Sequence, residues 1–111
     1  MISTDIAIAG AGPAGLTAGI YAARSGHRVL LIEKSFAGGQ MALTAEVENY
    51  PGFSEPVSGL LLAQSMEQQA ARFGCTTLNA EATSIRQLDS GFELTTTQEP
   101  VRSRAVIIST G

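Results

Sequence analysis

Three glycines near the start of the chain have the spacing of a loop that binds phosphates. They belong to the run Gly10-Ala11-Gly12-Pro13-Ala14-Gly15, which fits the pattern G-x-G-x-x-G. In this pattern the first glycine allows a tight turn, the second lets the backbone approach a pyrophosphate, and the third lets a helix pack closely on a sheet. A helix that begins here would point its free N–H groups and its positive dipole end at the phosphates.

An acidic residue strengthens this interpretation. Glu33 follows the glycine run at about the 20 residues that a dinucleotide-binding fingerprint requires. The apolar residues 6–9 and 29–32 predict two buried strands on either side of a helix over 13–25. A carboxylate that ends the second strand accepts hydrogen bonds from a ribose diol and disfavours a 2′-phosphate. The pattern therefore predicts FAD or NAD at this site and excludes NADP from it, without choosing between the first two.

The residues that follow predict a functional loop and a second helix. Residues 34–55 show no hydrophobic period and contain Gly38-Gly39 and Pro51-Gly52. A loop of this length is uncommon unless it has a function. Ser58 can cap a helix over 59–73, in which apolar residues recur at helical spacing.

The last third of the chain is predicted to form strands. The turn Asp89-Ser90-Gly91 predicts a hairpin, and the expected strands are 76–78, 82–88, 92–97 and 105–108. We therefore predict an α/β fold of three layers, of the Rossmann-like type. A central parallel sheet carries helices on one face and a small antiparallel β-meander on the other.

Composition narrows the class of protein. The formal charge of −3 argues against nonspecific binding to nucleic acid or to an anionic membrane surface. No apolar run approaches the roughly 18 residues of a membrane span, and the first residues lack the pattern of a secretory signal. A single cysteine excludes an internal disulfide framework. We expect a cytoplasmic protein.

The two side chains best suited to nucleophilic or acid–base chemistry, Cys75 and His27, lack suitable partners. Cys75 has no second cysteine with which to cycle a disulfide, and we expect it to be a small packing residue. His27 has no acidic or hydroxyl partner at motif spacing. We therefore expect a surface or strand-end histidine without a catalytic role. We predict no catalytic residue, no metal ligands and no nucleophile elbow in this chain.

Further motifs are specific enough to indicate a family. The first helix contains Ile20-Tyr21-Ala22-Ala23-Arg24, and the loop contains Gly38-Gly39-Gln40 and Glu46-Val47-Glu48-Asn49-Tyr50-Pro51-Gly52. The chain ends in Ser109-Thr110-Gly111, where the family has Ala-Thr-Gly. Over its whole length the chain resembles the FAD domain of thioredoxin reductases of the low-molecular-weight, bacterial type.

The resemblance implies FAD and adds residues to the expected site. By position, Gln40 and Asn49 would bond the isoalloxazine ring or the ribityl chain, although turn chemistry alone also explains an asparagine in such a loop. Thr44 would lie near the flavin, and the backbone of Ala82 would contact the adenine. The expected cofactor-binding residues are Gly10, Gly12, Pro13, Ala14, Gly15, Glu33, Lys34, Gly39, Gln40, Thr44, Asn49, Ala82, Thr110 and Gly111.

The resemblance also implies that the chain holds part of a larger enzyme. In the family, electrons pass from NADPH through FAD to the disulfide of a redox protein such as thioredoxin, and the enzyme is a homodimer. An inserted NADPH domain carries Cys-x-x-Cys, and a returning segment completes the FAD site with Gly-Asp. We expect residues 1–111 to be the N-terminal segment of the FAD-binding domain, inactive alone, with an unpaired edge on its parallel sheet.

Two other interpretations stay open at this point. A ferredoxin–NADP reductase of the same architecture would have the same flavin site and no redox cysteines. A non-catalytic nucleotide-binding module would carry ADP or nothing, and would show no flavin spectrum.

Overall fold

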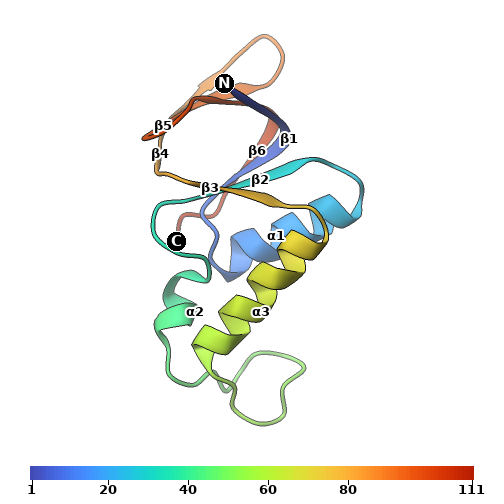
Figure 1. Ribbon diagram of the computed structural model, residues 1–111, viewed down its shortest axis with the longest axis vertical. Helices are drawn as coiled ribbons and strands as arrows, with labels where there is room; N and C mark the ends of the chain where they lie inside the picture. Colours follow the sequence, from blue (N-terminus) through green and yellow to red (C-terminus); the bar gives the residue numbers. More distant parts are fainter.

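The computed structural model describes residues 1–111. Its elements, in chain order, are β1 (Ile2–Ala9), α1 (Pro13–Arg24), β2 (Val29–Glu33), α2 (Gly39–Leu43), α3 (Gly59–Arg72), β3 (Thr76–Asn79), β4 (Ala82–Gln87), β5 (Phe92–Thr96) and β6 (Val101–Ile108). The six strands form one sheet in the order β3-β2-β1-β6-β5-β4 (Figure 1). No helix is long and apolar enough to cross a bilayer.

The first four strands in this order are parallel, and three of them, β2, β1 and β6, contain the continuous apolar runs that predicted buried strands. β1 lies between β2 and β6, so Ile8 is opposite both Leu31 and Ile107. β2 pairs with β3 on its other side, also in parallel. Ala7 and Ile8 are fully buried because both faces of this part of the sheet are covered.

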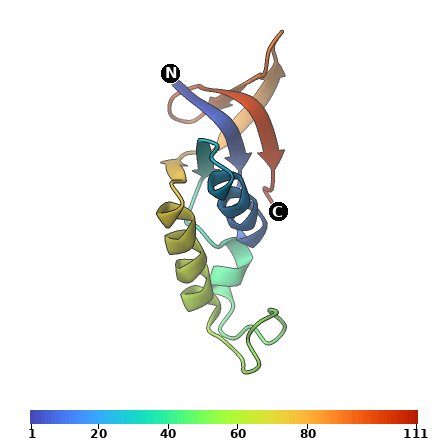
Figure 2. The same cartoon turned by 90° about the vertical axis from the view of Figure 1, so that its right-hand side faces the viewer.

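Helices α1 and α3 cover one face of the parallel strands and lie side by side against it (Figure 2). Leu16 of α1 and Leu62 and Met66 of α3 join Ile8 and Leu31 in one buried cluster. Each helix ends before a glycine with positive φ, as the glycine positions predicted.

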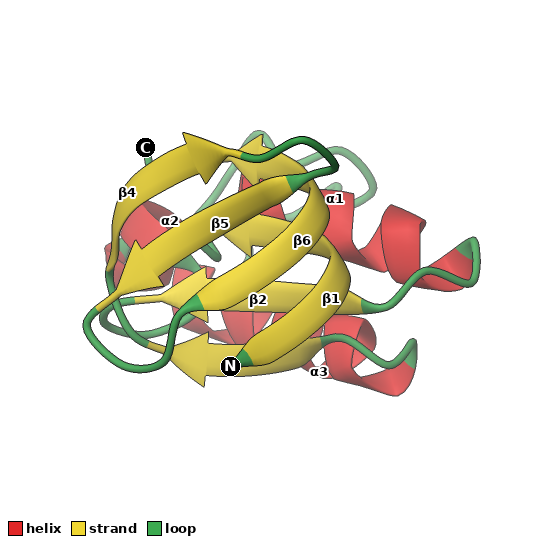
Figure 3. Cartoon of the chain, turned by 90° about the horizontal axis from the view of Figure 1, so that it is seen from above, coloured by secondary structure: helices red, strands yellow, loops and turns green.

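The β-meander covers the other face and confirms the three layers. Figure 3 shows β4 and β5 above the parallel strands, with the helices beyond them. Leu94 and Val101 from the meander side are fully buried against Ala7, Leu30 and Ile32. The meander is continuous with the parallel sheet, because the first residues of β6 pair with β5 as well as with β1.

Strand β6 is longer than the predicted strand 105–108. It begins at Val101, and the alternation of buried Val101 and Ser103 with exposed Arg102 and Arg104 marks its first half. Beyond Ser103 the strand pairs with β1 alone. The parallel sheet therefore has the unpaired edge that we expected, at residues 105–108.

The prediction of an irregular loop over residues 34–55 was wrong in part. The structure has a short helix, α2, inside it and a bridge between Val47 and Val57. Gly38 and Gly39 are typical of a loop, yet here both have positive φ, and Gly38 caps the helix that begins at Gly39. A side chain on Gly59 would collide with the carbonyl oxygens of Met41 and Thr44, so the start of α3 is packed directly on the end of α2.

The meander depends on Leu94 for its attachment to the sheet. We expect Leu94→Ala to lower the free energy of unfolding by about 3 kcal/mol, because it leaves a cavity in the second core. Urea unfolding followed by circular dichroism measures this. Ile85→Ala on β4 is the control, since Ile85 is 41% exposed. Equal losses in the two variants would contradict the buried contact.

Candidate cofactor site

The glycine run forms the turn between β1 and α1, at the carboxyl ends of the parallel strands, where α/β sheets bind their ligands. Two adjoining hollows open beside it and share Glu33, Lys34 and Thr110 in their walls. One extends toward Ala82 at the start of β4. The other runs over the start of α1 toward Gln40 in α2. Together they form one groove across the sheet edge.

Hydrogen bonds from three segments hold the backbone of the turn. The Gly10 N–H donates to the Ile32 carbonyl at 2.8 Å, which extends the pairing of β1 with β2. The Ala11 N–H donates to Oε1 of Glu33 at 2.9 Å. The Gly38 N–H donates to the Ala11 carbonyl at 2.7 Å and so ties the loop before α2 to the turn.

The first N–H groups of α1 have no partner within the chain. The N–H groups of Gly12, Ala14 and Gly15 make no hydrogen bond, Pro13 has none to donate, and the first helical bond runs from Leu16 to Gly12. In an α-helix these groups point along the axis beyond the N-terminus. They are therefore available to an anion in the groove, and the helix dipole favours negative charge there.

The three glycines of the motif serve different purposes. Gly10 has φ of +104°, and a side chain on it would collide with the carbonyl of Ser109. A side chain on Gly15 would collide with the Gly10 carbonyl, so this glycine lets α1 pack against the end of β1. Gly12 is different, because a Cβ there would meet nothing closer than the Gly39 Cα at 3.9 Å. The protein's own packing requires glycine at 10 and 15, and leaves open space at 12.

Glu33 has protein partners on both carboxylate oxygens. Oε1 accepts from the Ala11 N–H, and Oε2 accepts from the backbone N–H and the hydroxyl of Ser35 at 3.1 and 3.3 Å. We expected this carboxylate to accept from a ribose diol. A carboxylate has about four acceptor positions, so capacity remains on Oε1, and the residue also braces the turn.

Most of the expected site residues lie along the groove. Those that line it are Gly10, Gly12, Pro13, Ala14, Glu33, Lys34, Gly39, Gln40, Ala82, Thr110 and Gly111. Gly15 lies directly behind the turn, where it is buried.

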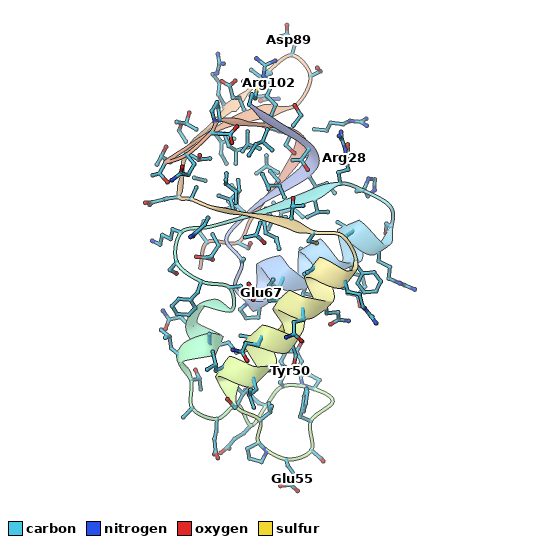
Figure 4. All side chains as sticks on the ribbon, viewed as in Figure 1. Arg28, Tyr50, Glu55, Glu67, Asp89 and Arg102 are labelled. Carbon is cyan, nitrogen blue, oxygen red and sulfur yellow. The ribbon has the colours of Figure 1, made fainter.

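The structure does not bring Thr44 and Asn49 into the groove. The Thr44 hydroxyl donates to the Gln40 carbonyl at 3.1 Å at the end of α2. Asn49 lies in a separate shallow hollow of the loop 48–54. Figure 4 labels Tyr50 in this loop, at the end of the molecule beyond α2. Contacts of Thr44 and Asn49 with a flavin stay predictions.

Several residues of the groove were missed by sequence reasoning. They are Ser35, Phe36, Met41, Leu43, Glu81 and Ser109. Phe36 and Leu43 are 49% and 67% exposed, and large apolar side chains near polar loops could have indicated a ligand surface. Ser109 belongs to the motif at 109–111, but its bond to Gly10 had no local signal, because the two residues lie at opposite ends of the sequence.

Cys75 and His27 lie outside the groove. Burial raises the pKa of the Cys75 thiol, which donates to the Gly19 carbonyl at 3.3 Å. A raised pKa disfavours the thiolate that redox or nucleophilic chemistry needs, so the cysteine is a packing residue, as expected. His27 is exposed just before β2. No group of three His, Cys, Asp or Glu side chains is placed to hold a metal ion.

Comparison with known proteins shows the family to which this chain belongs. The family model described as pyridine nucleotide-disulphide oxidoreductase matches residues 4–111, and the chain belongs to this family. Family membership implies a flavin cofactor.

Within the family the chain is similar to thioredoxin reductases. It is 43% identical to that of Treponema pallidum over 96% of this chain and 41% identical to that of Borreliella burgdorferi over the same share. The structure of the T. acidophilum thioredoxin reductase superimposes with a TM-score of 0.94, at 38% identity over 100% of this chain. The chain spans about a third of each relative, 35%, 33% and 36% respectively. The resemblance drawn from the motifs is confirmed.

The different surroundings of Gly12 and Gly15 can be tested directly. We expect Gly15→Ala to lower the free energy of unfolding by about 2 kcal/mol or more, because the methyl group displaces the Gly10 carbonyl. Gly12→Ala should cost less than about 1 kcal/mol, the scale of a changed helix N-cap. Urea denaturation without ligand compares the two, and a larger loss at Gly12 would show that the turn is packed differently.

Proposed function

We propose that this chain is the FAD-binding part of a flavin-dependent thioredoxin reductase. The observation that carries the proposal is the open space at Gly12, beside three N–H groups without partners. The pyrophosphate of FAD fits there, because the N–H groups supply donors and the glycine leaves room for close approach.

The two arms of the groove suit the two ends of the cofactor. On the adenosine side, the free acceptor capacity of Glu33 suits the ribose hydroxyls, and the start of β4 offers the backbone of Ala82 to the adenine. Lys34 lies in both hollows and can approach the phosphates. A carboxylate at this position disfavours a 2′-phosphate, which supports FAD over NADP here.

The other arm suits a flat, mostly apolar ring. Met41, Leu43 and Phe36 supply apolar surface beside the amide of Gln40, and flavin sites combine such walls with a few placed polar groups. Gly39 approaches Gly12 closely, since a side chain on it would lie 3.2 Å from the Gly12 Cα. When bound, FAD would supply the two-electron chemistry, while these residues bind and orient it.

For the whole protein we propose transfer of electrons from NADPH through FAD to the disulfide of a redox protein such as thioredoxin. The names of the relatives support this reaction. Residues 1–111 contain one cysteine, which is buried. We therefore assign this chain the binding of FAD, and assign the redox cysteine pair and the NADP(H) site to a separate domain. We also propose a cytoplasmic location, because thiols such as those of the proposed redox partner are kept reduced in the cytosol.

Binding of FAD tests the role of Gly12. We expect Gly12→Val to abolish binding of FAD, because the side chain fills the space of the pyrophosphate. Titration followed by quenching of flavin fluorescence measures the affinity. Binding of ADP should be lost as well, since ADP carries the same pyrophosphate.

Thr17→Val is the matched control, because it places a valine one turn along the exposed side of α1. This variant should bind FAD as the parent does. Equal affinity of Gly12→Val and the parent would remove the phosphate assignment. A parent that binds ADP and not FAD would indicate a nucleotide-binding module without flavin.

We also propose that the protein is a homodimer. Phe53, Leu60 and Leu61 are 46–60% exposed around the start of α3. Helices α2 and α3 pack against each other, and large apolar side chains exposed on neighbouring segments favour an interface. A second copy of the chain suits this surface, because most soluble oligomers are homodimers.

Replacement of Leu61 by a charged residue tests the dimer. We expect Leu61→Glu to shift the protein toward the monomer in sedimentation velocity, because a carboxylate at an apolar interface loses its hydration. Ile85→Glu on β4 is the control, since it adds the same charge away from this surface. A parent that sediments as a monomer would refute the proposal.

A further inference from the structure

Ser109, at the end of β6, contacts the glycine turn from the opposite end of the chain. Its hydroxyl lies 2.8 Å from the Gly10 carbonyl oxygen and 3.2 Å from that of Ala9. We propose that Ser109 is a positioning residue, whose hydroxyl orients the turn so that the N-terminus of α1 can bind the pyrophosphate. This inference rests on the proposed function.

The hydroxyl holds one side of a single peptide group. The carbonyl of the Gly10–Ala11 peptide accepts from Ser109, and its N–H donates to Glu33. No other group of the chain donates to the Gly10 carbonyl. Side chains from the ends of β6 and β2 therefore hold the two sides of this peptide, which limits its rotation.

This peptide directly precedes Gly12, the first of the unpaired N–H groups. Without the hydroxyl, the Gly10 carbonyl has no donor inside the protein and gains by turning toward water in the groove. A carbonyl oxygen turned that way would face the phosphates and repel them. The Ser109 oxygen also lies close to α1, since a side chain on Gly15 would come within 2.8 Å of it.

The substitution of Ser109 by alanine removes the one hydrogen bond that the Gly10 carbonyl accepts within the chain. We expect the affinity for FAD to fall about three- to tenfold in Ser109→Ala. The affinity for ADP should fall by the same factor, because the affected group is the pyrophosphate that both ligands share.

Ser103 provides a matched control within β6, the strand that ends directly before Ser109. Its hydroxyl also bonds backbone carbonyls, those of Ala105 at 2.6 Å and Asp5 at 3.2 Å, and it does not line the groove. Ser103→Ala should affect stability in urea as Ser109→Ala does and leave both affinities unchanged. The test uses the protein at its natural full length, titrated with FAD and with ADP.

Two further variants separate positioning from general damage. Ser109→Thr keeps the hydroxyl and should restore both affinities. Ser109→Cys nearly keeps the size of the side chain but replaces the hydroxyl by a much weaker donor, so it should show the same loss of affinity as Ser109→Ala. It replaces Ser109→Ala in the test if the alanine variant does not fold.

The outcomes distinguish this inference from the proposed function. A parent that binds FAD, with unchanged affinity in Ser109→Ala, overturns the inference and leaves the function standing. A loss for FAD without a loss for ADP also overturns it, since the effect would then lie at the flavin. A parent that binds neither ligand removes the function and the inference together.

Discussion

The site depends on how closely helix α1 approaches the end of strand β1. Gly15 lies against the Gly10 carbonyl with no room for a side chain. This contact allows α1 to begin with only three residues between it and the end of β1. The free N–H groups of the helix therefore lie directly at the sheet edge. A longer or looser connection would move the helix dipole away from the groove, and the donors would face water rather than a ligand.

This close approach is supported by both layers of the domain. Leu16 fixes α1 on one face of the parallel strands, while Leu94 and Val101 seal the other face. Strand β6 connects the two, because it pairs with β1 along its length and with β5 at its beginning. The end of β6 is thereby held beside the turn, and this explains how Ser109 can act on Gly10 at the other end of the chain.

The elements that could be predicted from the sequence are those set by local patterns. Apolar runs and glycine positions gave the strand–helix–strand unit, and the hairpin turn gave the meander. Helix α2 was missed because residues 34–55 have no hydrophobic period and Gly38-Gly39 is typical of a loop, while in the structure the positive φ of these glycines introduces a helix supported by α3. The beginning of β6 was missed because its continuous apolar run starts only at Ala105, after the exposed Arg102 and Arg104.

The residues of the candidate site also divide into those set by a local pattern and those set by contacts between distant parts of the sequence. The glycines of the site and Glu33 follow a pattern with fixed spacing, and so their places near the groove could be inferred. The bond from Ser109 to Gly10 spans nearly the whole chain, and no local spacing encodes it. The second role of Glu33 was hidden for a similar reason, since its contact with Ala11 exists only after β1 and β2 have paired.

The surroundings of the three motif glycines separate requirements of folding from requirements of binding. Gly10 and Gly15 have neighbours that any side chain would strike, so packing alone explains them. Gly12 has none, and alanine would be a tolerable residue there if the fold were the only constraint. The absence of a side chain at 12 is therefore explained by the proposed ligand, which would occupy the space beside Gly12 and accept from the unpaired N–H groups of Gly12, Ala14 and Gly15. A linked pair of phosphates has the charge and the acceptors to fill it.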